Sequence, residues 1–200
     1  MTKPAWPEGY GRRVLVQVDS TLSEAARIAP LLAGPEWILA LSQTAARGRR
    51  GREWSMPAGN FAATLVLPLS EPPGRAALRS FVVSLALRDA FVAVTGREDV
   101  FALKWPNDVL LRGGKVAGIL LETMSSGGHF GHLAIGVGVN LAVAPDVSDV
   151  EAGAVRPVAL ASELGTRISP EDFLDQLAQA YARYEGQFVT YGFAPIRTAW

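Results

Sequence analysis

The sequence has no cysteine and only two histidines, and these shortages exclude several kinds of site. Without a thiol there can be no disulfide, no thiolate nucleophile and no cysteine-bound zinc. His129 and His132 lie in a Gly-rich stretch with no further ligand beside them, so we interpret them as turn residues and expect no metal site. Any chemistry must rest on other side chains.

An excess of charge and a long apolar run are also missing. The 19 basic and 19 acidic residues cancel, whereas a dedicated nucleic-acid or membrane binder usually carries a large positive excess. No apolar run is long enough to span a bilayer. The first residues hold proline, glycine and glutamate where a secretory signal needs an apolar core. We therefore expect a cytoplasmic protein with no membrane contact and no specific DNA binding.

What the sequence does contain suits one globular domain. Its 200 residues are 49% hydrophobic, which is enough to bury a sizeable core without disulfides. We expect a loose tail over residues 1–13, because proline, glycine and charge interrupt any periodic pattern there. One folded domain is expected over residues 14–200.

Helix and strand signals alternate irregularly along this domain. Thr21 and Glu24 form a capping-box pattern at the start of one helix, and Ser169 followed by a proline marks the start of another. Glycine-bearing turns at residues 112–114 and 126–128 favour antiparallel hairpins. The mixed order predicts an α+β fold with a mixed, largely antiparallel sheet. We expect strands over residues 14–18, 37–41, 61–69, 100–105, 109–111, 115–124 and 130–141, further helices over 78–91 and 157–164, and a break at 72–74.

Lys104 lies near the end of the strand expected over residues 100–105, which is otherwise apolar. Alternation places Phe101 and Leu103 on one face, together with Trp105, and Lys104 then points to the other face. A lysine in so apolar a setting must reach solvent or meet an anion. Pro106 ends the strand, and a polar corner follows. From these residues alone, a lysine that merely extends to solvent before a turn is an equally good interpretation.

Residues 43–54, which we call the arginine loop, interleave glycine with arginine and end at Trp54. Such a backbone can turn its amides toward an anion, and arginine forks match the geometry of carboxylates and phosphates. Trp54 could stack on a flat ring such as adenine. The loop therefore suits phosphate handling. A solvated surface loop and an RGG-like nucleic-acid segment are the alternatives.

Two hydroxyl side chains, Ser20 and Thr21, lie at a strand-to-helix junction. They could bind a small polar ligand, but a helix cap formed by Thr21 and Glu24 explains them as well, and without other support we favour the cap. Lys115 begins a later buried strand in which Gly118 permits close backbone approach. A plain hairpin strand with an exposed lysine is the alternative there.

Two glycines, Gly136 and Gly138, interrupt the last expected strand. Glycine weakens a strand, so we expect a ligand or another backbone to lie against it, with a simple bulge as the alternative. The pattern differs from the GxGxxG of dinucleotide-binding folds because it lies within a strand and opens no helix. Asn140, at the end of this strand, has an amide that could read a base edge.

Taken in this order, the segments resemble the biotin protein ligase (biotin–acetyl-CoA-carboxylase ligase) family. The most specific match is Lys104-Trp105-Pro106-Asn107-Asp108 together with the arginine loop. The resemblance implies a mixed sheet flanked by helices, related to class II aminoacyl-tRNA synthetases and lipoate ligases. It also implies the reaction: biotin and Mg-ATP form biotinyl-5′-AMP, from which a lysine of biotin carboxyl carrier protein takes the biotin. The other matching segments are residues 19–21, 115–122 and 136–140.

The resemblance further implies a role for each candidate residue. Lys104 would contact the biotin carboxyl group and the acyl-phosphate oxygens, and Arg47 and Arg49 would handle phosphate, so these three are the catalytic candidates. Asn107 and Asp108 would hold the corner after the strand or help with magnesium. The biotin-binding candidates are Ser20, Thr21, Gln43, Arg47, Lys104, Gly118 and Gly136, and the nucleotide-binding candidates are Arg49, Arg50, Trp54, Asn107, Lys115 and Asn140.

Members of this family often carry a DNA-binding winged helix before this region, and they usually continue into a small SH3-like barrel after it. The short ends of this sequence predict that the first is missing and that the second is absent or truncated. A lipoate or octanoate ligase or transferase on the same fold is one alternative, although the two motifs together favour biotin. A non-catalytic nucleic-acid-binding module is another, and the neutral net charge counts against it.

Overall fold

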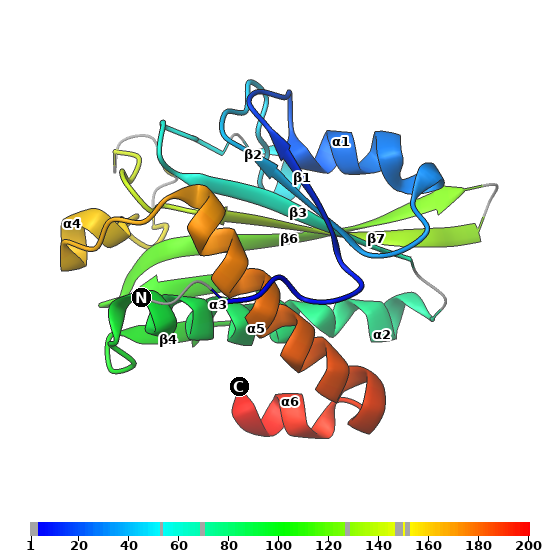
Figure 1. The fold of residues 1–200 in the computed structure, drawn as a ribbon. Helices are drawn as coiled ribbons and strands as arrows, with labels where there is room; N and C mark the ends of the chain where they lie inside the picture. The colour runs from blue at the N-terminus through cyan, green and yellow to red at the C-terminus, as the bar shows by residue number, and fades with distance from the viewer. Residues whose placement is uncertain (1–3, 53, 69–70, 127–128, 147–149, 151–152) are drawn as a thin grey trace.

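The protein folds around one mixed β-sheet (Figure 1). The computed structural model describes residues 4–52, 54–68, 71–126, 129–146, 150 and 153–200. Within these residues, seven strands form the sheet in the order β1-β2-β3-β7-β6-β5-β4. The strands are β1 Gly11–Leu15, β2 Glu36–Ala40, β3 Phe61–Pro68, β4 Phe101–Lys104, β5 Asp108–Leu111, β6 Gly114–Ser126 and β7 His129–Val139.

The pairing of the strands is mostly antiparallel. β1 runs parallel to β2, and every other neighbouring pair in this order is antiparallel. The prediction of a mixed, largely antiparallel sheet is therefore confirmed. β6 and β7 lie in the interior of the sheet, between β3 and β5, and are its longest strands. Both edges of each are hydrogen-bonded, so they offer a rigid floor for a site.

Helices cover both faces of the sheet. α3 and α5 pack together on one face, and α1 lies over the other (Figure 1). Alternation along the strands builds both layers: Trp37 and Leu39 belong to the larger core, whereas Ile38 packs on the α1 side with Val66. The helices are α1 Thr21–Ile28, α2 Pro73–Ala77, α3 Arg79–Thr95, α4 Leu160–Leu164, α5 Pro170–Tyr191 and α6 Ala194–Ala199, with 3-10 turns η1 Ala29–Leu31 and η2 Arg49–Gly51.

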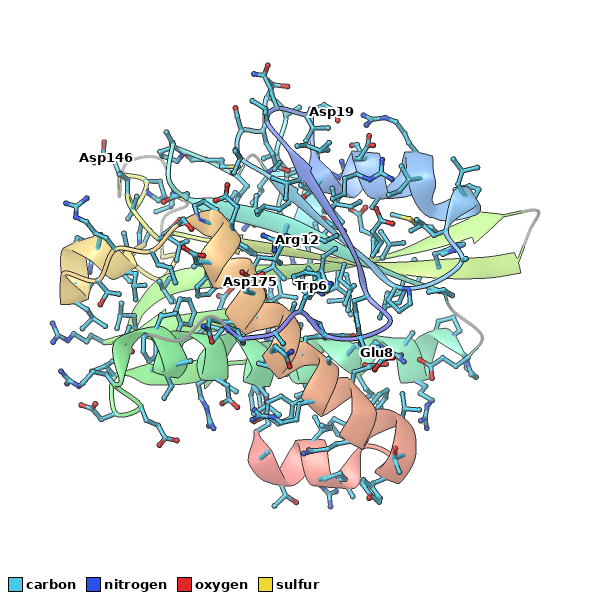
Figure 2. All side chains as sticks on the ribbon, viewed as in Figure 1. Trp6, Glu8, Arg12, Asp19, Asp146 and Asp175 are labelled. Atoms are coloured by element: carbon cyan, nitrogen blue, oxygen red, sulfur yellow. The ribbon has the colours of Figure 1, made fainter. Side chains whose placement is uncertain are left out.

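The N-terminal segment is attached to the body of the fold. β1 begins at Gly11, so the tail predicted for residues 1–13 is wrong from Gly11 onward. Arg12 Nη1 donates a hydrogen bond to Oδ1 of the buried Asp175 on α5 at 2.7 Å. The Arg12 guanidinium also lies 5.0 Å from the centre of the Trp6 ring. Figure 2 shows these three labelled side chains near one another, where the segment crosses α5.

Ser20, and not Thr21, caps α1. Ser20 has an extended backbone (φ −155°, ψ 140°), and its Oγ accepts a hydrogen bond from the Leu22 amide at 3.2 Å. The predicted capping box is wrong because the Glu24 carboxylate pairs with Arg27 instead. The Thr21 hydroxyl is consequently available for a tertiary contact.

The other predicted helices are present, but one is shorter than predicted and another helix lies where a break was expected. Ser169 caps α5 by accepting from the Asp172 amide at 3.0 Å. The helix expected over residues 157–164 is shorter and forms α4. The segment 72–74, expected to be a break, leads into α2, because proline in the first turn of a helix forfeits no hydrogen bond. No helix in the described parts of the chain combines the length and apolar character needed to cross a membrane.

Candidate functional site

A cavity of about 980 Å³ opens on the α1 side of the sheet. This is the size of pocket that takes a nucleotide-sized ligand. β6 and β7 form its floor, and its walls come from the start of α1, the arginine loop, the β4–β5 corner and the segment after β7. All sequence-predicted site residues line it except Arg49, whose side chain lies outside the described part of the chain. Those lining residues are Ser20, Thr21, Gln43, Arg47, Arg50, Trp54, Lys104, Asn107, Lys115, Gly118, Gly136 and Asn140.

One end of the cavity carries neutral polar groups that hold one another in place. The Thr21 amide donates to Gln43 Oε1 at 2.7 Å, and Thr64 Oγ1 donates to Thr21 Oγ1 at 2.9 Å. Gln43 Nε2 reaches the sulfur of Met56 at 3.4 Å. Thr64 was not among the predicted residues, although a hydroxyl within the apolar run of β3 was a signal for it. The result is a pre-oriented set of hydroxyl and amide groups.

The β4–β5 corner forms a second, cationic part of the cavity. The strands pair Lys104 with Asp108 directly. The Asp108 carboxylate bridges two lysines, with Oδ1 2.7 Å from Lys115 Nζ and Oδ2 3.9 Å from Lys104 Nζ. Two positive charges therefore share one negative charge, which leaves a net positive charge facing the cavity.

Local hydrogen bonds hold this corner rigid. Asn107 Nδ2 donates to the Ile119 carbonyl at 2.9 Å, and the Ile119 amide returns a bond to the Asn107 carbonyl at 2.9 Å. Asn107 thus fastens the corner to β6. Phe101 is buried in the core, whereas Trp105, which was predicted on the same face, is 67% exposed. Lys104 is itself half-exposed and faces the cavity.

The glycines on the cavity floor make room for protein side chains. Gly118 and Gly138 face each other across β6 and β7, and the Trp54 indole lies over both. A Cβ built on Gly138 would lie 2.6–2.7 Å from indole atoms, and one on Gly118 would lie 3.2 Å away. Gly136, which was predicted to admit biotin, lines the cavity, and a Cβ there would also meet Leu22 of α1 at 3.1 Å. Gly136 therefore accommodates the helix.

Arg47 points across the sheet toward β6. Its Nε and Nη2 donate to the two carboxylate oxygens of Glu122 at 3.4 and 3.0 Å, and its Nη1 donates to Ser23 Oγ at 2.9 Å. The guanidinium is thereby held on two sides at the cavity wall. The Glu122 contact was missed from the sequence, where the only signal was a charge within an apolar strand.

The segment after β7 is fixed by two asparagines. Asn140 is buried and donates from Nδ2 to the Val158 carbonyl at 3.1 Å. Asn60, which was not predicted, accepts from the Ala142 and Val143 amides at 2.9 and 3.1 Å and donates to the Val143 carbonyl at 2.7 Å. The Asn140 amide nitrogen is thus engaged by backbone, and it helps to form the wall of the cavity.

The model of the biotin/lipoate A/B protein ligase family matches residues 13–140, the stretch that supplies most of the residues lining this cavity. The chain belongs to this family. It is 56% identical over 187 residues to a biotin–[acetyl-CoA-carboxylase] ligase of Paracoccus denitrificans, a match that covers 94% of this chain and 78% of the relative. It is 35% identical over 138 residues to the bifunctional ligase/repressor BirA of Escherichia coli, covering 68% of this chain and 42% of that protein.

A solved structure supports membership in the biotin/lipoate ligase family through the fold. The crystal structure of the biotin protein ligase from Leishmania major in complex with biotinyl-5-AMP superposes with a TM-score of 0.74 at 25% identity. The match covers 95% of this chain and 81% of that chain. The fold implied by the resemblance, a mixed sheet flanked by helices, is therefore confirmed.

Carboxylates are scarce in the cavity of this family member. Asp108 is the one acidic residue among the described lining residues, and lysines face both of its oxygens. Among the described residues, no group of three or more His, Cys, Asp or Glu side chains is placed to hold a metal ion. The donor set of the cavity suits anions.

Proposed function

We propose that this chain is a biotin protein ligase that uses ATP to join biotin to a lysine of biotin carboxyl carrier protein. The observation that carries the proposal is the single cavity, which joins a neutral hydrogen-bonding end to a cationic corner. A small carboxylic acid with a polar ring would place its ring at the neutral end. Its carboxylate and the phosphates of a nucleotide would lie at the cationic corner. The 56% identity to a protein named as a biotin ligase supports biotin as the acid. We place the reaction in the cytoplasm and the catalytic domain in residues 14–200.

In the first step, two anions must approach each other. A carboxylate oxygen of biotin forms a bond to the α-phosphorus of ATP. The bond from that phosphorus to its bridging oxygen breaks, and pyrophosphate leaves with the electron pair. The protein must offset the repulsion and hold the groups in line. Lys104 would contact the carboxylate and the phosphate oxygens, and Arg47 and Arg49 would supply further positive charge to phosphate.

Asp108 gives the corner its geometry. Without it, the ammonium groups of Lys104 and Lys115 would repel each other and move independently. The carboxylate holds both while leaving one net positive charge for the substrate. Charges that are fixed before the reaction need no reorganisation during it. Preorganised electrostatic groups of this kind are typically the largest single contribution to transition-state stabilisation in enzymes.

The neutral end suits the ureido ring of biotin, which offers both N–H donors and a carbonyl acceptor. Ser20, Thr21 and Gln43 would bind this ring, and Gly118 would allow the ligand to lie near the floor beside Trp54. In the part of the cavity that biotin leaves free, the Trp54 indole would contact adenine. On this proposal, Arg49, Arg50, Trp54, Asn107, Lys115 and Asn140 bind the nucleotide, and Gly136 acts through α1.

Magnesium accompanies ATP in the proposed reaction, and the described residues of the cavity offer no group of three His, Cys, Asp or Glu side chains to hold it. Magnesium prefers carboxylate and phosphate oxygens. The Asp108 carboxylate is taken by two lysines, and no second described carboxylate lines the cavity. The ion would therefore enter with the triphosphate.

In the second step, the deprotonated amine of the carrier lysine attacks the acyl carbon of biotinyl-5′-AMP. A nitrogen–carbon bond forms, the bond from carbon to the phosphate oxygen breaks, and AMP leaves with the electron pair. The proton lost by the amine passes to solvent. Lys104, beside the acyl-phosphate, would stabilise the charge that develops on the departing phosphate.

Exchange of labelled pyrophosphate into ATP tests the first step. The folded chain should catalyse exchange when biotin is present and not when it is omitted. Exchange with lipoate but not with biotin would show a lipoate ligase on the same fold. Folded protein that catalyses no exchange with either acid would contradict the ligase proposal.

A further inference from the structure

The Arg47–Glu122 pair lies at the edge of the cavity. Arg47 lines the cavity, whereas Glu122 does not. Strand alternation puts Glu122 on the same face of β6 as Gly118 and Leu120, both of which line the cavity. Glu122 therefore faces the arginine loop from one position beyond the cavity floor, and its link to a ligand by direct contacts runs through Arg47.

The contacts of Arg47 fix the plane of its guanidinium. Two of its five N–H groups go to Glu122 as a fork, and a third goes to Ser23 Oγ on α1. One N–H on each terminal nitrogen has no partner among the described residues. The guanidinium thus spans β6 and α1 with donors left over for an anion.

This pair contributes orientation more than stability. The side chains of Arg47 and Glu122 are 35% and 32% exposed. Ion pairs this open to water add little to the free energy of folding. A freely rotating arginine would have to be ordered when the phosphate binds, and that ordering has a cost which a preformed pair avoids.

We propose that Glu122 is a positioning residue that orients Arg47 for the phosphate in the adenylation step. The proposal rests on the proposed ligase function. The Glu122 carboxylate also lowers the positive potential near the cavity. Loss of the charge therefore has two separable effects: the arginine becomes less well oriented, and the cavity becomes more attractive to ATP. The rate of adenylation should fall while the KM for ATP stays level or falls.

Adenylate formation by Glu122→Gln tests this. Glutamine keeps the shape but loses the charge and one arm of the fork. We expect kcat to fall roughly 3- to 10-fold, the range expected for ordering one long side chain, with no rise in the KM for ATP and an unchanged Tm. The matched control is Glu36→Gln, which removes a similar pair with Arg13, 3.0 Å long, at a site that does not line the cavity. It should leave kcat unchanged.

A double-mutant cycle shows whether Glu122 acts through Arg47. In an Arg47→Ala background, adding Glu122→Gln should cause no further loss of kcat, because there is no guanidinium to orient. A full additive loss would overturn the proposal, as would an unchanged kcat in Glu122→Gln alone. A kcat that falls only in step with Tm would show a structural role instead.

A measurement without the reaction separates this inference from the proposed function. The Nε–H of Arg47 should give a slowly exchanging nitrogen–proton NMR signal in the unmodified chain, and Glu122→Gln should weaken it. If no such signal is seen in the unmodified chain, the positioning role is wrong whatever the reaction is. If the signal is present but pyrophosphate exchange is missing, the proposed function alone has failed.

Discussion

The indole ring of Trp54 lies directly on Gly138, so close that a single methyl group would collide with it. A Cβ on Gly138 would stand 2.6–2.7 Å from three indole atoms. Lys115 completes the arrangement, with its ammonium 5.6 Å from the centre of the indole ring. The end of the arginine loop thus packs on the sheet at Gly118 and Gly138, where β6 and β7 carry no side chain.

Gly138→Ala should therefore displace Trp54. Distances below 3.0 Å are not sustained by real Cβ atoms, so the ring must move away from the floor. We expect the affinity for ATP to fall, with a modest fall in Tm, because the arginine loop loses its seat. Binding of ATP by calorimetry measures the first effect and thermal denaturation the second.

The control for this prediction is the same substitution in a Trp54→Ala background. With the indole gone, the added methyl meets no ring, so Gly138→Ala should change Tm and ATP affinity little there. Equal effects in both backgrounds would mean that Gly138 is needed for the strand itself and not for Trp54.

Lys104→Ala should separate activity from stability. Lys104 is half-exposed, and its contact with Asp108 is 3.9 Å long, so its loss should change the free energy of unfolding by less than about 1 kcal/mol. Loss of one preorganised charge at the reacting phosphate should lower the rate of adenylate formation about 100- to 1,000-fold. Arg97→Ala, at a surface arginine paired with Asp99, is the control. An unfolded Lys104→Ala variant would point to a structural lysine.

Thr64→Val should weaken binding at the neutral end of the cavity. Valine keeps the shape of threonine but cannot donate to Thr21 Oγ1, so the Thr21 hydroxyl loses its fixed orientation. We expect a fall of about 1 kcal/mol in the free energy of unfolding and a weaker biotin affinity. Thr95→Val removes a hydroxyl that donates to the Phe91 carbonyl and accepts from the Arg97 amide, away from the cavity, and it should leave biotin binding unchanged. Equal biotin affinities for Thr64→Val and the unmodified chain would refute the assignment of this end.

The protein should lose stability in alkali because of its buried tyrosines. Burial, reinforced by the negative charge of Glu185, raises the pKa of Tyr10 from 10.0 to about 12, and the same causes raise the pKa of Tyr181. Between these values the unfolded chain has released the proton and the folded chain has kept it. The free energy of unfolding therefore falls as pH rises from about 10 to about 12, by up to about 1.4 kcal/mol per pH unit for each tyrosine.

Denaturant titrations across this pH range test the sign and the residue. Tyr10→Phe should make the decline shallower, because phenylalanine has no proton to lose. Tyr191→Phe, at a side chain that is 73% exposed, should leave the slope unchanged. A slope that Tyr10→Phe does not alter would assign the alkaline loss to other groups.

The parts of the site that could be foreseen from the sequence are those carried on short segments. The lysine, proline and asparagine of the β4–β5 corner lie within a few residues of one another, so the sequence placed Lys104 near the end of a strand before a polar corner, and the family resemblance assigned both residues to the site. The sheet was predictable for a similar reason, since glycine-bearing turns at residues 112–114 and 126–128 mark two of its hairpins in the sequence.

The parts that could not be foreseen depend on partners far along the chain. Arg47 and Glu122 are 75 residues apart, and a single charge in a strand does not reveal which residue it meets. Gly136 and Gly138 look alike in the sequence and share a face of β7, but α1 covers the first and Trp54 the second. Only the packing of those two segments decides which glycine admits which neighbour.

The same reason explains the misassigned helix cap. Ser20 and Thr21 are adjacent hydroxyl residues, and the spacing to Glu24 favoured Thr21. The tertiary hydrogen bond from Thr64 holds Thr21 within the helix, and Ser20 adopts the extended backbone of a cap. The local sequence pattern and the tertiary contact therefore give different roles to Thr21, a residue that is proposed to bind biotin.

Transfer of biotin to a carrier protein tests the whole account most directly. The folded chain is incubated with purified biotin carboxyl carrier protein, ATP, magnesium and biotin, and the intact mass of the carrier is measured. The account predicts a gain of one biotinyl group on one lysine, dependent on both ATP and biotin and largely lost with Lys104→Ala. An unmodified carrier, under conditions where an established biotin ligase modifies the same preparation, would contradict it.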